Sequence, residues 1–160
     1  MLAGERYKTS DPELLADRRR TREPCLKLAA LSPHASEAER GALRTQPFGA
    51  ATAASVTLPF ICDYGRNIEL GRNVYFNWPG CSGLHGISPD ACKEGRTGLE
   101  YDKAITVGND VWLGGGAIVC TGVFIGEGAV IGAGSVVLRN IPPGVFAAGN
   151  PCRVIRELAP

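Results

Sequence analysis

Two histidines, His34 and His85, are the side chains of this 160-residue chain that titrate near neutral pH without any special environment. A neutral imidazole can take a proton from a weakly acidic group such as an alcohol, which makes histidine the commonest general base. His85 lies in a polar segment rich in turn-forming residues, and His34 stands just before a predicted helix start. From the residues alone, His85 is open to two interpretations, a base or an exposed loop histidine. We expect His34 at the surface.

Three arginines near the C-terminus, Arg139, Arg153 and Arg156, are candidates for binding a ligand that carries phosphates. Guanidinium groups hold phosphate oxygens through charge-assisted hydrogen bonds. The alternative is that they are solvated cations at the end of a domain. The whole chain has a formal net charge of only +1, so no strong field indicates nucleic acid or a membrane surface as a partner.

The six cysteines give neither a disulfide framework nor a metal-binding pattern, because none of them forms a Cys-x-x-Cys pair. We therefore expect reduced thiols in a reducing compartment. Two separate histidines fall short of the three or so that a catalytic zinc site needs, so no metal is expected. The N-terminus lacks the apolar core of a signal peptide and no apolar run is long enough to span a membrane, which favours the cytoplasm.

A six-residue repeat in the last third of the chain predicts how these groups are positioned. Aliphatic residues recur every six positions, and a second, mostly smaller set follows each of the first five after four positions. The first set is Val107, Leu113, Val119, Ile125, Ile131 and Val137, and the second is Val111, Ala117, Val123, Ala129 and Ser135. This period fits neither a helix nor a simple alternating strand. It is typical of an all-β solenoid in which a short strand and a tight turn repeat and both sets point inward.

A shorter run of the same repeat, Tyr64, Leu70 and Phe76, precedes the long one. The step from Phe76 to Val107 is 31 residues, which is not a multiple of six. The intervening residues, about 79–104, contain many turn formers and no repeat, and we expect them to leave the solenoid as a loop excursion.

Residues 1–55 are predicted to form a separate helical segment before the solenoid of residues 56–160. Ser10 with Glu13 and Ser36 with Glu39 each have the spacing of a helix-starting capping box. Pro24 is expected to end or kink the first of these helices, because proline lacks the amide hydrogen that the helix interior needs.

Taken together, these segments resemble the maltose and galactoside O-acetyltransferase family. The stretches that carry the resemblance are AGERYKTSDPELLADR, CDYGRNIELGRNVYFN, GLEYDKAITVGNDVWLGGGAIVCTGVFIGEGAVIGAGSVV and IPPGVFAAGNPCRVIREL, which cover nearly the whole chain. The hexapeptide region alone would indicate only the superfamily, whereas the N-terminal segment, CDYGRNI and AGNPCRVI are specific to this subgroup. The resemblance implies a left-handed parallel β-helix, a homotrimer and three acetyl-CoA sites between neighbouring subunits.

The resemblance also implies a role for particular residues. His85 matches the general base and Gly115 the amide that stabilises the oxyanion of the reacting thioester. Asn77 matches a contact to the hydroxyl acceptor. Acetyl-CoA contacts are implied for Trp112, Ala133, Gly134, Arg139, Arg153 and Arg156. Structural interpretations remain open beside these roles: Gly115 as a turn glycine, Asn77 as a corner amide and Trp112 as an anchor between subunits.

The chain departs from the family on the acceptor side. Relatives have a further coil between Asn77 and the histidine loop, with a carboxylate that lines the acceptor pocket. Here WPGCSGL connects the two directly, so that about twenty residues, close to one coil, are absent. Gly86 also replaces the usual proline after the histidine, and Leu138 replaces a common threonine.

The resemblance therefore predicts an acetyl-CoA-dependent O-acetyltransferase that acts on a sugar or a similar small alcohol. The shortened region leaves two alternatives: a catalytically impaired trimer, kept as a scaffold or arising from a truncated gene, and an acetyltransferase of an antibiotic or secondary metabolite. A zinc hydratase on the same kind of solenoid is disfavoured, because it would need about three histidines for each metal.

Overall fold

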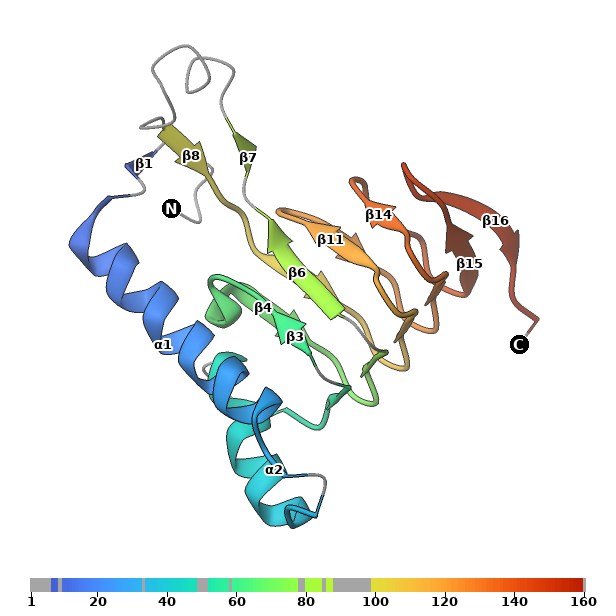
Figure 1. Ribbon diagram of the computed structural model, residues 1–160. Coiled ribbons are helices and arrows are strands. Elements are labelled where there is room, and N and C mark those ends of the chain that lie inside the picture. Colours follow the sequence, from blue (N-terminus) through green and yellow to red (C-terminus); the bar gives the residue numbers. More distant parts are fainter. Residues whose placement is uncertain are drawn as a thin grey trace.

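The computed structural model describes residues 7–8, 10–32, 34–48, 52–57, 59–77, 80–84, 86–87 and 99–159, with side chains left undescribed in 80–84, 86–87 and 99–101. Helices α1 (Pro12–Ala29) and α2 (Glu37–Thr45) lie at one end of the molecule, and a stack of short strands extends from them to the C-terminus (Figure 1). Almost all of the strands belong to three sheets that the chain visits in turn, so the stack is a three-sided coil.

The three sheets form the faces of this coil, numbered in the order in which the chain meets them. Face 1 contains β2 (Ser55–Val56), β5 (Tyr75–Phe76), β10 (Trp112–Leu113), β13 (Val130–Ile131), β15 (Val145–Ala148) and β16 (Arg153–Glu157). Face 2 contains β3 (Phe60–Ile61), β6 (Gly80–Leu84), β11 (Ile118–Cys120) and β14 (Val136–Val137). Face 3 contains β4 (Ile68–Leu70), β9 (Ile105–Val107) and β12 (Phe124–Ile125). We call the turns between faces corner 1–2, corner 2–3 and corner 3–1.

The register between strands confirms the six-residue repeat. Trp112 pairs with Val130 on face 1, and Ile118 pairs with Val136 on face 2, so each turn of the coil takes 18 residues, or three repeats. All of these pairings are parallel except that of the last strand, β16, which runs antiparallel to β15. A side chain therefore lies on its equivalent from the neighbouring turn.

The two residue sets of the repeat fill the inside of the coil, as predicted. All eleven are buried, each with at most 4% of its surface exposed. In the first turns the core is aromatic: the ring centroids of Phe48 and Phe60 lie 5.5 Å apart, and those of Phe60 and Phe76 lie 5.3 Å apart. Phe48 belongs to η1 (Gln46–Phe48), so the N-terminal segment contributes directly to the core of the coil.

The helix signals of the N-terminal segment are only partly correct. The Ser36–Glu39 capping box is present. Helix α1, however, is capped by the Asp11 carboxylate, which accepts a hydrogen bond from the Glu13 amide at 2.9 Å, and not by Ser10. The prediction that the helix ends at Pro24 is wrong, since it continues to Ala29. Cys25 and Leu28, which follow the proline, are buried, and this packing outweighs the lost hydrogen bond.

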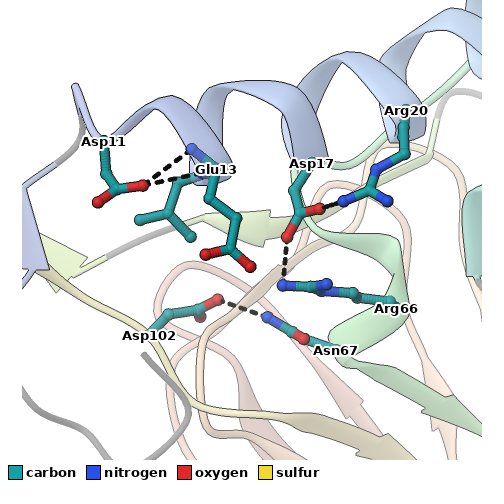
Figure 2. A network of polar contacts seen from close by, with 8 residues as sticks. Asp11, Glu13, Asp17, Arg20, Arg66, Asn67 and Asp102 are labelled. Atoms are coloured by element: carbon teal, nitrogen blue, oxygen red, sulfur yellow. Dashed lines mark hydrogen bonds and ion pairs between the residues drawn. The ribbon is translucent and has the colours of Figure 1, made fainter.

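A polar network joins α1 to the coil (Figure 2). Asp17 of α1 is buried and forms ion pairs with Arg20 and with Arg66 of η2 (Gly65–Asn67). The next residue, Asn67, donates from Nδ2 to Oδ2 of Asp102 at 3.2 Å. The network therefore runs from the helix, across the first turn of the coil, to the residue that precedes β9.

The excursion leaves and rejoins the coil without disturbing its phase. Strand β4 pairs directly with β9, with Ile68 opposite Ile105, a step of 37 residues in place of 18. The extra residues include β7 (Gly86–Ile87) and β8 (Leu99–Tyr101), which form a small antiparallel sheet with β1 (Tyr7–Lys8). At the return point, buried Asp102 accepts hydrogen bonds from the Thr121 hydroxyl and from the Lys103 amide. The return of the excursion is thus fixed at corner 2–3.

A search of the described helices finds none with the length and apolar character needed to cross a bilayer.

We expect Ile131→Asp to prevent accumulation of soluble, folded protein. Ile131 is 1% exposed inside the coil, and an unpaired carboxylate there costs several kcal/mol, a large part of the total stability of a domain. Leu138→Asp is the matched control, because Leu138 is 53% exposed one residue after β14. Soluble yield and the circular dichroism spectrum of both variants test the prediction. A soluble Ile131→Asp protein with the wild-type spectrum would contradict the inward direction of the repeat.

Candidate functional site

Corner 1–2 brings together four of the predicted site residues, Asn77, Gly115, Ala133 and Gly134. They follow β5, β10 and β13, three neighbouring strands of face 1. The Asn77 amide donates to the carbonyl of Leu113 at 2.9 Å, and the Gly134 amide donates to the carbonyl of Gly115 at 2.9 Å. These bonds stack the residues in a column along the edge of the coil.

The surface of this column is formed by the backbone, because the turns approach one another too closely for side chains. A Cβ atom on Gly114 would lie 2.6 Å from the amide nitrogen of Ala133 and 2.8 Å from the carbonyl oxygen of Ile131. Gly116 and Gly134 have φ angles of +72° and +68°, in the left-handed region that glycine adopts without strain. Glycine is therefore required at this corner both by space and by conformation.

Two amide groups of the column are available as hydrogen-bond donors. Among the described residues, the N–H groups of Gly115 and Ala133 have no hydrogen-bond acceptor. The N–H group of Gly134, in contrast, already binds the carbonyl of Gly115. A ligand lying along the corner would thus find amide donors at Gly115 and Ala133, one on each of two successive turns, whereas Gly134 offers only its carbonyl.

Trp112 lies on the outside of face 1, directly before this corner. Its side chain is 49% exposed, and its ring centroid lies 6.3 Å from that of Tyr75 on the neighbouring strand, with an angle of 60° between the rings. The Tyr75 hydroxyl lies 3.1 Å from Oγ1 of Thr57 one turn further along. Tyr75 and Trp112 together form an aromatic surface, which suits either the edge of a ligand site or a contact between subunits.

Arg153 and Arg156 are presented by the antiparallel strand β16. Arg153 is opposite Ala148, the last residue of β15, so it lies at the end of face 1 that leads to corner 1–2. Arg156 is opposite Phe146, and its guanidinium carbon lies 5.9 Å from the centre of that ring. Both side chains are exposed, and Nη1 of each donates to a backbone carbonyl of a neighbouring residue.

Arg139 lies at a different corner. It follows β14 and is exposed at corner 2–3, so it is separated from Arg153 by the width of face 2. The three arginines that are close in the sequence therefore do not form one cluster within a single chain. Strand β6 of face 2, which directly precedes His85 in the sequence, leads toward the same corner as Arg139. His85 itself lies outside the described residues.

No cluster of three or more metal-binding side chains is found in the described ranges. Cys152, which directly precedes β16, is buried, and this burial raises the pKa of its thiol. A thiol with a raised pKa is a poor nucleophile at neutral pH, so Cys152 has the character of a packing residue.

Two residues that contribute to this region were not predicted from the sequence. Tyr75 stands in the shorter repeat as an ordinary outward-facing position, and only the pairing of β5 with β10 brings it to Trp112. Asp102 lies inside the excursion, and its burial depends on Asn67 and Thr121, which are 35 and 19 positions away. The one available signal for Asp102 was its position just before the repeat resumes.

Two family profiles match the chain: the maltose acetyltransferase hexapeptide capping motif over residues 1–52, and the bacterial transferase hexapeptide repeat over residues 104–139. A putative acetyltransferase of Saccharomyces cerevisiae, YJL218W, is 37% identical over 179 aligned positions, which cover 99% of this chain and 91% of the relative. Since this chain has 160 residues, at least 19 of those positions in the yeast protein have no counterpart here.

Solved structures show the same similarity. A maltose O-acetyltransferase from Clostridium difficile superimposes with a TM-score of 0.79 at 30% identity, covering 99% of this chain and 95% of that protein. A hexapeptide-repeat acetyltransferase from Vibrio cholerae, VCA0836, was solved in complex with acetyl-CoA. It gives a TM-score of 0.76 at 27% identity and covers 100% of this chain and 97% of its own.

Proposed function

Because the chain belongs to the maltose and galactoside O-acetyltransferase family, we propose that it transfers the acetyl group of acetyl-CoA to a hydroxyl of a sugar or a similar small alcohol. The proposal includes the left-handed coil of the family, with residues 1–55 as a helical cap and residues 56–160 as the β-helix that carries the site. Acetyl-CoA is the co-substrate, and no metal takes part.

The observation that carries the proposal is the column of backbone groups at corner 1–2, which leads along the coil toward Arg153. A pantetheine arm contains two amides, and it would bind in an extended form along unpaired backbone groups such as the Ala133 amide and the Gly134 carbonyl. The phosphates of coenzyme A would meet the guanidinium groups of Arg153 and Arg156 on β16. Trp112 would border the slot that holds the thioester.

In the proposed reaction, His85 removes the proton of the acceptor hydroxyl as the oxygen attacks the thioester carbonyl. The negative charge that develops on the carbonyl oxygen is stabilised by the Gly115 amide, a donor without another acceptor in the described residues. The C–S bond then breaks, the acetyl group stays on the acceptor oxygen, and the coenzyme A thiolate takes the proton from His85. The acceptor would be oriented by the side chain of Asn77.

The division of the candidate residues between two corners supports a site shared by neighbouring subunits. Gly115, Ala133 and Arg153 belong to corner 1–2, whereas Arg139 and the strand that precedes His85 belong to corner 2–3. One complete site would form where corner 1–2 of one subunit faces corner 2–3 of the next. A cyclic trimer has three such contacts and leaves no corner of this kind unused.

The acceptor is proposed by class only, and two alternatives remain beside it. At least 19 positions of the yeast relative are missing here, in the region where the family binds its acceptor. This observation favours, as a second candidate, an impaired trimer that binds acetyl-CoA without using it. An antibiotic or secondary metabolite is the third possibility. We further propose a cytoplasmic location, because four free cysteines among the described residues suit a reducing compartment.

Calorimetric titration with acetyl-CoA, followed by measurement of released thiol with a panel of sugars and other alcohols, tests the proposal. Binding together with turnover of a sugar supports it. Binding without turnover of any alcohol would favour the impaired trimer, and the lack of any binding would overturn both.

We expect Arg153→Ala to weaken acetyl-CoA binding by about tenfold or more, with little effect on folding. A charge-assisted hydrogen bond to a phosphate contributes roughly 1.5–3 kcal/mol, and Arg153 is exposed on the final strand. Calorimetry gives the affinity, and thermal melting checks the fold. Arg72→Ala serves as a control, since Arg72 is an exposed arginine at corner 3–1. Equal affinities for wild type and Arg153→Ala would remove this residue from the site.

His85→Ala is expected to lower acetyl transfer by about 10²- to 10⁴-fold, the usual contribution of a general base, while acetyl-CoA still binds. Binding should survive, because the proposed cofactor contacts come from later turns of the coil. His34→Ala is the matched control, since His34 is the other histidine and is exposed. Initial rates at saturating acetyl-CoA distinguish the two variants. Unchanged turnover in His85→Ala would show that another group is the base.

In solution we expect a mass of about 51 kDa, three times the 16.9 kDa of one chain. The outer faces expose large apolar side chains, including Ile61, Trp112 and Phe124, and association would bury them. Light scattering coupled to gel filtration measures this mass. A stable monomer at micromolar concentration would argue against a site shared between subunits.

A further inference from the structure

Two cysteines that are 37 positions apart in the sequence, Cys25 and Cys62, meet beneath helix α1. Cys25 lies in α1, and Cys62 directly follows β3, against which α1 packs. Both thiols are free, with exposed fractions of 7% and 2%, and a hydrogen bond joins their side chains. The fold therefore holds two thiols from separate elements in direct contact.

An ion pair holds the helix in this position. Nε of Arg22 donates to Oδ1 of Asp63 at 2.6 Å. Arg22 lies one turn before Cys25 on the helix, and Asp63 directly follows Cys62. The charged contact is thus next to the pair of thiols on both elements and limits how far they can separate.

The environment makes Cys25 the more reactive of the two thiols. The hydrogen bond from the Cys62 thiol, assisted by backbone amides, lowers the pKa of Cys25 despite its burial. At Cys120, in contrast, burial raises the pKa. Because the thiolate is the reactive form, Cys25 is expected to react before Cys120 with an oxidant.

Small reagents can reach the pair from a hollow between α1 and face 2. This hollow has a volume of about 370 Å³, and both cysteines line it together with Leu26, Phe60 and Ile61. Leu26 and Ile61 are 70% and 57% exposed, so the hollow opens at the surface of the chain. A peroxide molecule is far smaller than this space.

We propose that Cys25 and Cys62 are a redox-sensitive dithiol, which a peroxide converts into a disulfide that fastens helix α1 to the first turn of the coil. The Cys25 thiolate attacks one peroxide oxygen and the O–O bond breaks, which leaves a sulfenic acid on Cys25 and releases water or an alcohol. The Cys62 sulfur then attacks the Cys25 sulfur, the S–O bond breaks, and the hydroxyl group leaves as water with the proton of Cys62. Two thiols are oxidised and one peroxide is reduced.

The disulfide would constrain the unfolded chain by closing a loop that runs from the helix to the coil. A crosslink of this length raises Tm by on the order of 5–10 °C in a chain of this size, provided that it forms without strain. Reduction with dithiothreitol should reverse the shift. The outcome would be a cap that is more firmly attached under oxidising conditions.

Mass spectrometry of the full-length protein after treatment with hydrogen peroxide tests the proposal directly. The expected product is a tryptic peptide of residues 23–27 joined by a disulfide to the peptide of residues 45–66, with each peptide containing one cysteine. A thiol titration in denaturant should fall from six to four groups per chain. If Cys25 is instead recovered as a free thiol, over-oxidised, or joined to another cysteine, the proposal is wrong.

Matched variants separate this pair from the other thiols. Cys120→Ser should retain the crosslink and the rise in Tm, because Cys120 lies on β11 of face 2, away from the helix. Cys25→Ser and Cys62→Ala should each lose both. An oxidation-dependent rise in Tm that persists in Cys25→Ser would overturn the proposal. The peptide analysis of wild type keeps the test decisive even where a variant folds poorly.

Discussion

The structure depends on one steric constraint, the close stacking of each turn of the coil on the next. Aliphatic residues six apart fill the inside completely, and Ile125 and Val137 have no exposed surface at all. At the corners the backbones come so close that Gly114 has no room for a Cβ atom. The interior is therefore too narrow for a ligand, and any binding surface has to lie along the outer edges. The candidate site at corner 1–2 follows from this packing, because the same contacts that exclude side chains leave backbone donors at the edge.

Stacking of this kind couples each turn mainly to its neighbours, so whole turns can be gained or lost with little effect on the rest. The direct pairing of Ile68 with Ile105 shows the result: the coil remains in register across an excursion that adds 19 residues to the usual step of 18. The absence of about one further turn, compared with the yeast relative, is consistent with this modular behaviour. The shortening affects which groups lie next to the acceptor rather than the stability of the coil.

The repeat could be predicted from the sequence because each repeat residue meets a chemically equivalent residue one turn away. Ile131 announces its own environment, and so does the Ser36–Glu39 cap, since both depend on short-range patterns. Contacts between distant segments gave no such signal. Pro24 remains in a helix because the residues after it pack on the coil, Asp17 is buried because Arg66 meets it, and Arg139 is separated from Arg153 because a face of the coil lies between them. The column at corner 1–2 follows from the repeat, whereas the position of the excursion depends on Asn67, Asp102 and Thr121.

The antiparallel strand β16 has a consequence for the solubility of the molecule. A stack of parallel strands ends in an unpaired edge, onto which further chains could add without limit, as they do in amyloid fibres. Here β16 covers the edge of β15, and its own sequence, RVIRE, places two arginines and a glutamate on the new edge. At the opposite end, helix α1 and η1 pack on the first turns. Both ends of the coil are thereby protected from end-to-end polymerisation, so that growth of the assembly is restricted to contacts between its sides.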